Sequence, residues 1–236
     1  MLSRLAVSLF CLAAVTGTSA QAMDNRLSAD ISSFTLQEPS GQLSLHLVPS
    51  TTLISGYSSP FYSRNPQTGG ITLHTDGLQP PVRGTIAPET LLRENSAWYF
   101  QQTSSDLEAA LHIDRIPKNG RITIGRLTSQ QGTIAELRVE GDRVLAIVNN
   151  GTSTQKVVAG TVYPQQTVRY SIHTTPNGLL LISVNGTTSH FSLPSAATTQ
   201  ALWFEAIAGE QGFHRPSHSD AARVTFTGLQ VHHQAT

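Results

Sequence analysis

Short runs of alternating apolar and polar residues recur along this chain of 236 residues. A period of two in segments rich in β-branched residues is typical of strands that bury one face. The runs occupy residues 41–49, 69–77, 107–117, 120–129, 134–141, 143–151, 167–175, 178–186, 188–194, 201–209 and 222–233. Asn-Gly pairs, which favour hairpin turns, occur at 119–120, 150–151, 177–178 and 185–186. No segment keeps a helical period for three turns, although residues 87–95 could form a single helical turn. The pattern predicts an all-β fold: a sandwich or jelly roll of two antiparallel sheets.

The first 22 residues have the layout of a secretory signal peptide: Arg4, an apolar run over 5–15, then Ala-Gln-Ala at 20–22. The apolar run is shorter than the roughly 20 residues that span a bilayer, which argues against a retained anchor. Cleavage after Ala22 would leave one domain, residues 23–236, without the only cysteine, Cys11. We therefore expect a secreted or periplasmic monomer that leaves the membrane once the signal is removed.

The charge balance excludes some functions. The chain has 15 basic and 15 acidic residues, and no basic stripe that nucleic-acid binding would need. It contains no phosphate-binding loop, no Ser-His-Asp pattern and no cofactor fingerprint, so no cofactor is expected. His214 and His218 are four residues apart in a loop that contains proline, which is weak support for a metal site, and none is predicted.

Several segments, read in order, resemble polysaccharide lyase family seven, the alginate lyases with a concanavalin-like jelly roll. The stretch LISGYSSPFYSRNPQTGGITLHTDG resembles the entry strands of that family, and APETLLREN lies where it carries P-R-S-E-L-R-E. The family carries G-Q-I-H followed by L-x-L-R where this chain has ITIGRLTSQQGTIAELRV. It carries Y-F-K-A-G-V-Y-N-Q where this chain has WFEAIAGEQ, and SDAARVTFTGLQVHH resembles its C-terminal strand. The resemblance covers the mature chain and implies a jelly roll with a concave cleft.

The resemblance also implies a chemistry and a partner, an acidic polysaccharide. Such lyases remove the C5 proton of a uronate and expel the 4-linked oxygen, using an arginine, a glutamine, a histidine and a tyrosine to stabilise charge and move protons. Carried over position by position, these four fall on Glu89, Arg126, Thr128 and Gly209. The residues around them are kept: Pro88, Leu92, Arg93, Glu94, Gly125, Phe204, Ala206 and Gln211. The frame resembles the family, but its four catalytic residues are replaced.

Alternate residues of a strand share a face, so the resemblance predicts which side chains line the cleft. That predicted floor consists of Glu89, Leu91, Arg93, Arg126, Thr128, Trp203, Glu205 and Ile207. Arg126 could clamp a substrate carboxylate or pair with Glu89 or Glu205. The two glutamates could form a glycosidase pair or merely neutralise arginines. Trp203 could stack on a sugar or simply pack. Glu89, Arg93, Thr128, Trp203, Glu205 and Gln211 are the predicted substrate-binding residues.

Proton transfer would need replacements for the missing groups. His214 or His218 could act as the base, or remain solvated loop histidines. Tyr99 could donate a proton, or serve only in aromatic packing. With Arg126, these three are the candidate catalytic residues. The sequence therefore predicts a secreted, polysaccharide-lyase-like protein that acts on or binds an acidic, uronate-containing polysaccharide, by β-elimination if active. The alternatives are an inactive carbohydrate-binding pseudoenzyme and a glycosidase that uses Glu89 and Glu205.

Overall fold

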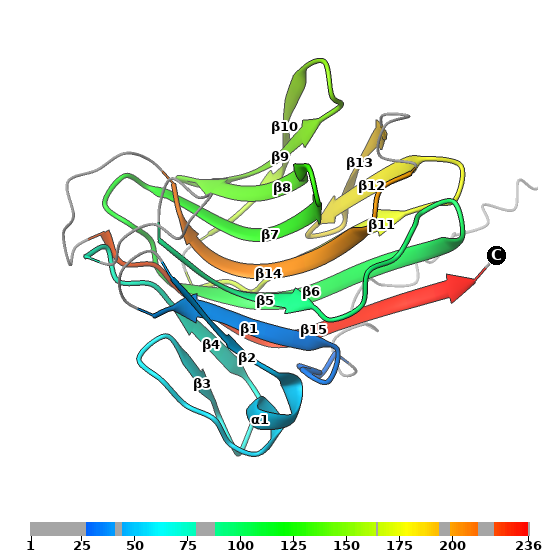
Figure 1. Cartoon of the computed structure of the whole chain (residues 1–236). Helices are drawn as coiled ribbons and strands as arrows, with labels where there is room; N and C mark the ends of the chain where they lie inside the picture. Colours follow the sequence, from blue (N-terminus) through cyan, green and yellow to red (C-terminus); the bar gives the residue numbers. More distant parts are fainter. Residues whose placement is uncertain are drawn as a thin grey trace, which may run out of the picture.

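Two antiparallel β-sheets lie face to face and contain nearly all of the regular structure (Figure 1). The structure is a computed structural model that describes residues 27–40, 44–78, 88–163, 165–193, 199–211 and 220–235. The signal-peptide prediction for residues 1–22 falls outside these residues. The predicted all-β sandwich is confirmed.

One sheet has eight strands in the order β10-β9-β8-β7-β14-β5-β1-β2. Strands far apart in the sequence alternate in its middle, because β14 pairs with both β5 and β7. Its strands are β1 Phe34–Pro39, β2 Leu45–Val48, β5 Glu89–Glu94, β7 Arg121–Ser129, β8 Gly132–Glu140, β9 Arg143–Asn149, β10 Thr154–Thr161 and β14 Leu202–Glu210.

The other sheet has seven strands in the order β13-β12-β11-β6-β15-β4-β3. The long strands β6 and β15 form its centre and pair along most of their length. Its strands are β3 Tyr62–Arg64, β4 Ile71–His74, β6 Thr103–Arg115, β11 Val168–Thr174, β12 Leu179–Val184, β13 Thr187–Ser192 and β15 Arg223–Ala235. One short helix, α1 (Ser50–Ile54), precedes β3.

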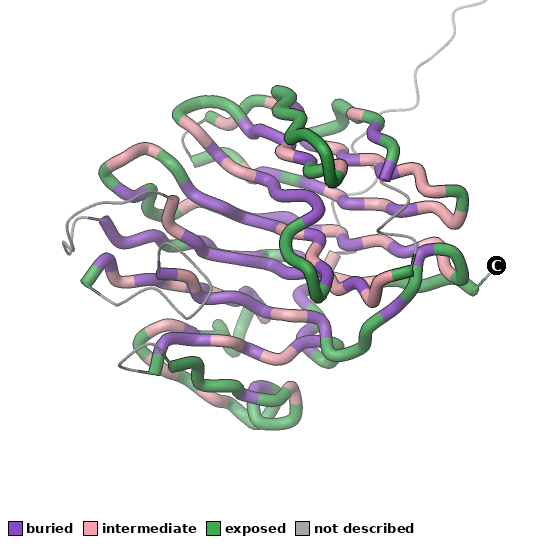
Figure 2. Tube along the Cα trace, turned by 45° about the horizontal axis from the view of Figure 1, so that its top comes forward, coloured by how far each residue is buried: buried purple, intermediate pink, exposed green. Residues whose placement is uncertain are grey.

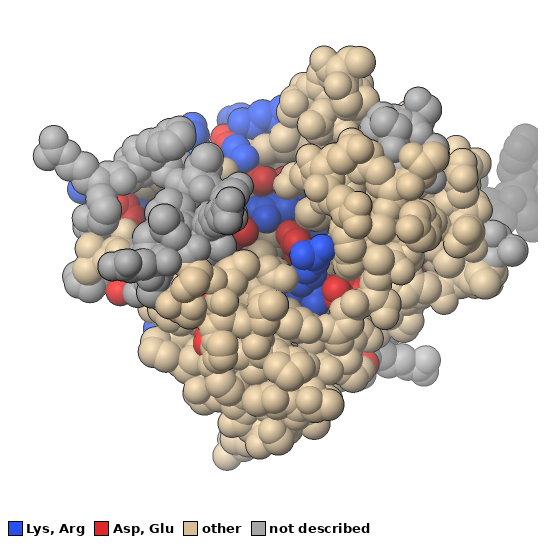
Figure 3. Space-filling view, viewed as in Figure 1, with Lys and Arg blue, Asp and Glu red and all other residues tan. Residues whose placement is uncertain are grey.

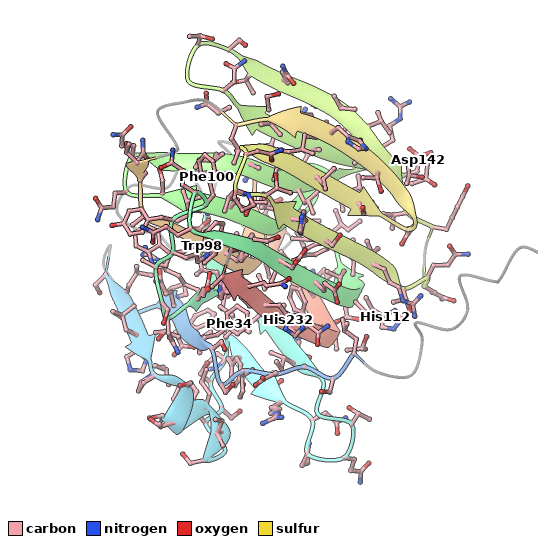
Figure 4. The ribbon with its side chains drawn as sticks, turned by 90° about the vertical axis from the view of Figure 1, so that its right-hand side faces the viewer. Phe34, Trp98, Phe100, His112, Asp142 and His232 are labelled. Carbon is pink, nitrogen blue, oxygen red and sulfur yellow. The ribbon has the colours of Figure 1, made fainter. Side chains whose placement is uncertain are left out.

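The hydrophobic core fills the space between the sheets, and Figure 2 shows that burial is greatest along the central strands. Each sheet contributes the apolar members of its alternating runs, such as Phe34 and Phe204 from one and Phe226 from the other. Phe34, Trp98 and Phe100 lie in this packed interior (Figure 4), and all three are at most 5% exposed. Apolar burial on this scale explains how a sandwich without disulfides can hold together.

Two residues kept from the family frame have structural reasons. The buried Glu94 carboxylate accepts hydrogen bonds from the Trp98 indole (2.9 Å) and the Phe204 amide (3.0 Å), and it contacts the His233 ring across the sandwich. Gly125 lies against Tyr170 of the opposite sheet, where a Cβ would be 2.7 Å from the phenol oxygen. Both contacts join the two sheets beneath the outer face of β5, β7 and β14.

Local predictions of turns succeed in part. Asn150-Gly151, Asn177-Gly178 and Asn185-Gly186 join paired strands, and each glycine has a positive φ, between 82° and 87°. The hairpin predicted at Asn119-Gly120 is wrong, since this turn carries the chain from β6 in one sheet to β7 in the other. Turn chemistry sets the local backbone but does not decide which sheet the next strand joins. The single helical turn expected in residues 87–95 is also wrong, because most of that segment is β5.

Candidate functional site

The outer face of the eight-stranded sheet is curved and lines a hollow, the groove, along which basic and acidic side chains alternate (Figure 3). Strands β5, β14 and β7 lie side by side there, and their register places Glu205 between Arg93 and Arg126. Trp203 on β14 lies directly opposite Thr128 on β7, and Ile207 on β14 lies opposite Leu91 on β5. Residues predicted to share the cleft floor from strand parity therefore do lie on one face, next to one another.

Arg126 is held by carboxylates on three strands. Its guanidinium lies 2.9 Å from Glu89 Oε2, 3.3 Å from Glu205 Oε2 and 4.0 Å from Glu136 Oε2. Only 12% of the Arg126 side chain is exposed, and Glu205 is buried. Of the two roles predicted for Arg126, the structure shows the ion pair. Nη1 and Nη2 hydrogen-bond to Glu205 and Glu89, while Nε is buried and makes no hydrogen bond within the described residues. The positive charge of Arg126 is therefore offset by carboxylates of the protein itself.

The electrostatics of this cluster follow from burial and pairing. Burial opposes the charge of Arg126, but the nearby carboxylates outweigh it and hold the pKa of the guanidinium above its ordinary value. Burial raises the pKa of Glu205, and the charge of Arg126 reverses only part of the rise. Glu205 and Glu89 accept hydrogen bonds from Nη1 and Nη2 of Arg126. Of the two roles considered for these glutamates, a glycosidase pair or the neutralisation of arginines, the structure shows the second.

Glu136 on β8 is a member of the cluster that the sequence did not single out. Its Oε1 accepts hydrogen bonds from Arg138 Nε at 2.8 Å and from Thr123 Oγ1 at 3.1 Å, and Thr123 in turn accepts one from Gln211 Nε2 at 2.7 Å. Strand parity over residues 134–141 places Glu136 on the same face as Arg138. Only the pairing of β8 with β7 shows that this face is shared with Arg126.

Arg93 and Trp203 form a second feature of the floor. The Arg93 guanidinium lies over the Trp203 ring, 4.2 Å from the ring centre, as in a cation–π contact. Both side chains are partly exposed, unlike their buried neighbour Glu205. The stacked pair offers a flat apolar surface and a positive charge side by side. The first suits the apolar face of a sugar ring and the second suits the carboxylate of a uronate.

The position where the resemblance places the family tyrosine is a buried glycine with close neighbours. A Cβ at Gly209 would lie 3.6 Å from the Cβ atoms of Glu89 and Thr123, and 3.1 Å from a methyl of Ile207. The φ of Gly209 is not positive, so the backbone does not demand glycine. A side chain here would project beside Glu89, at the edge of the Arg126 cluster.

Of the other candidate proton-transfer groups, the structure describes Tyr99 alone, and its hydrogen bonds are not with this cluster. Tyr99 lies in the turn after β5, is 43% exposed, and accepts hydrogen bonds from Gln102 and Thr103 through its carbonyl. His214 and His218 fall outside the described residues. Their catalytic roles remain predictions.

Glu210, which follows Gly209 on β14, is a titratable group that the sequence did not identify. It points away from the groove, and its carboxylate accepts a hydrogen bond from Thr75 Oγ1 at 3.2 Å. Its pKa is raised to about 7, mainly by burial and to a lesser extent by the nearby acids Asp220 and Asp76, while the Thr75 hydrogen bond opposes the rise. Within the part of the chain that the structure describes, no group of three or more His, Cys, Asp or Glu side chains is placed to hold a metal ion.

Comparisons with known proteins agree with this architecture. A family model described as alginate lyase matches residues 29–233. An alginate lyase from Pseudomonas aeruginosa superposes with a TM-score of 0.79 at 26% identity, over 87% of this chain and 100% of that one. Alginate lyase A1-II', a member of polysaccharide lyase family 7, gives 0.75 at 17% identity, over 88% of this chain and 97% of that one. The alginate lyase from Corynebacterium sp. gives 0.74 at 16% identity, over 88% and 96%. No curated protein matches the chain.

Proposed function

The chain belongs to the alginate lyase family, and from this we propose that it binds an acidic, uronate-containing polysaccharide in its groove without cleaving it by the lyase reaction. The occupation of Arg126 by three carboxylates carries the proposal. Lyase chemistry needs a positive group that is free to neutralise the uronate carboxylate, together with a base and an acid at the C5 proton and the leaving oxygen. In the described groove the charge of Arg126 is already offset by three carboxylates.

Binding is supported by Arg93 and Trp203, which are both partly exposed on the groove floor. Arg93 stacked on Trp203 combines positive charge with an aromatic face, a combination suited to a sugar acid. Family membership makes alginate the first polymer to test. Losing several groups that act together removes most of an enzyme's rate, whereas binding through other contacts can persist.

The second candidate is a lyase with rebuilt proton transfer, and membership of a family of lyases favours it. In that case His214 or His218 would take the C5 proton, because a neutral imidazole suits this task near neutral pH. β-Elimination creates an unsaturated uronate that absorbs in the ultraviolet. A rise in absorbance with alginate, glucuronan or pectate, abolished by His214→Ala or His218→Ala, would establish this alternative.

The experiment for the main proposal uses the same polymers in two assays. Ultraviolet absorbance should stay flat during prolonged incubation, while migration of the protein in native gels that contain one of the polymers should be retarded. A flat trace without retardation by any polyuronate would refute binding, and a sustained rise in absorbance would refute the loss of lyase chemistry.

We further propose that the protein is exported and begins at Met23 after removal of residues 1–22. No helix among the described residues is long and apolar enough to cross a membrane. N-terminal sequencing of the protein recovered from its host tests this proposal, and retention of residues 1–22 would contradict it.

A further inference from the structure

We infer that the carboxylates of a bound polyuronate are received by a basic wall on β7, β8 and β10, formed by Arg121, Arg138 and Lys156, and not by the guanidinium of Arg126. The inference rests on the proposed binding function and identifies where along the groove the acidic chain is held. Its basis is the uneven distribution of charge on one face of the sheet.

The basic wall surrounds a single carboxylate. Glu140 Oε2 lies 3.1 Å from Lys156 Nζ, and Glu140 Oε1 lies 3.5 Å from Arg138 Nη1 and 3.8 Å from Arg121 Nε. Three cations therefore share one anion here, whereas three anions share one cation at Arg126. Arg138 belongs to both groups, since it also binds Glu136. Over the whole network four positive and four negative side chains balance, but the positive excess lies on the basic wall.

Two of the three cations of the basic wall, Arg121 and Lys156, are also accessible, while Arg138 is 21% exposed. The side chains of Arg121 and Lys156 are 53% and 49% exposed, against 12% for Arg126. Figure 3 shows Lys and Arg side chains gathered at the upper rim of the hollow. Surface ion pairs of this kind contribute little to stability, so an incoming carboxylate can compete for these cations at low cost.

The surface between the charges suits the rest of a sugar ring. Leu145 lies between Arg138 and Val158 in the cross-strand register, and Ile147 lies between Glu136 and Lys156. Val158 is 50% exposed. A uronate offers a carboxylate at one edge and an apolar C–H face, and the basic wall offers cations and aliphatic side chains in alternation.

The distance across the strands predicts a dependence on chain length. Strand β5, which carries Arg93, and strand β10, which carries Lys156, are five places apart in the sheet, which corresponds to roughly 24 Å at the usual spacing. A short oligouronate bound at Arg93 and Trp203 cannot also reach Lys156, whereas a longer one can. Affinity should therefore rise with oligosaccharide length until the chain reaches the basic wall.

The test is titration calorimetry of the purified protein with short and long alginate oligosaccharides at low and at physiological salt. The double variant Arg121→Glu/Lys156→Glu should bind the long oligosaccharide about tenfold or more weakly and lose most of the salt dependence. Its affinity for the short oligosaccharide should change little. The matched control is Arg64→Glu/Arg223→Glu, which makes the same charge change at exposed positions of the other sheet. Lys156→Gln, a milder change, should weaken binding in the same direction.

Three results separate the inference from the function on which it rests. If the wild-type protein binds alginate but the wall variant binds the long oligosaccharide as tightly, the inference fails and the proposed function stands. An equal loss in the control variant would show that net charge alone steers binding, which also overturns the inference. If the wild-type protein binds no polyuronate, both are overturned.

Discussion

Replacing Arg126 by alanine should destabilise the protein strongly, because it removes the guanidinium that Glu89 and Glu205 share. Glu136 would keep hydrogen bonds from Arg138 and Thr123, so most of the cost falls on the other two carboxylates. Breaking a buried ion pair by removing one partner costs about 3–5 kcal/mol. We expect a loss near the lower end, about 3 kcal/mol of unfolding free energy at neutral pH, since Glu89 is 12% exposed.

Urea unfolding followed by tryptophan fluorescence measures this loss, since both tryptophans, Trp98 and Trp203, lie close to the cluster strands. The triple variant Arg126→Met/Glu89→Gln/Glu205→Gln should recover most of the stability, because no charge is then left unpaired. The deficit of Arg126→Ala should shrink as the pH falls, since burial raises the pKa of Glu205 and protonation removes its charge.

A loss below about 1 kcal/mol would refute the reasoning, because that is the size expected of an exposed arginine. Arg126 would then be free to bind substrate, as in the lyase alternative. Arg64→Ala, at an exposed position on β3, is the control and should change the unfolding free energy little.

Three further predictions concern neighbouring positions. Gly125→Ala should cost about 1–3 kcal/mol in thermal or urea unfolding, because the added Cβ would lie 2.7 Å from the Tyr170 oxygen and 2.8 Å from its Cζ. Unchanged stability would contradict this packing. The pKa of Glu210 is raised to about 7, so between about pH 5 and pH 7 the native state binds more protons than the unfolded chain. The free energy of unfolding should therefore fall by about 1 kcal/mol, after solvent screening, as the pH rises from about 5 to about 8. Glu210→Gln should flatten this profile, and an equally steep profile in the variant would assign the effect to other groups. Trp203→Ala should weaken alginate retardation in native gels about five- to tenfold, because it removes the aromatic surface under Arg93; unchanged retardation would exclude this pair from the binding surface.

Strand parity, applied to the segments that the family resemblance assigns to the cleft, predicted which residues share the groove face, since side chains alternate in any strand. It placed Arg126 and Glu205 on the same face, although 79 positions separate them in the chain. Their contact depends on β14 pairing with β5 and β7, which is a long-range property that local patterns do not contain. For the same reason Glu136 was missed, because its face was predictable but its partner strand was not.

The family positions inferred from the resemblance illustrate another limit. The resemblance places the family tyrosine at Gly209, where an added Cβ would lie 3.6 Å from the Cβ of Glu89 and 3.1 Å from a methyl of Ile207. Whether Arg126 was free or paired could not be decided from residue types, since both roles use a guanidinium near a carboxylate. The 2.9 Å contact with Glu89 distinguishes the two.

The central claim is that the groove binds a polyuronate and leaves it intact. The most direct measurement combines calorimetry of a long alginate oligosaccharide on the purified protein with mass spectrometry of the same mixture after prolonged incubation. The account predicts saturable binding and an oligosaccharide of unchanged mass. Shorter fragments that carry an unsaturated terminal uronate would contradict it and would make this protein an active lyase with a rebuilt site.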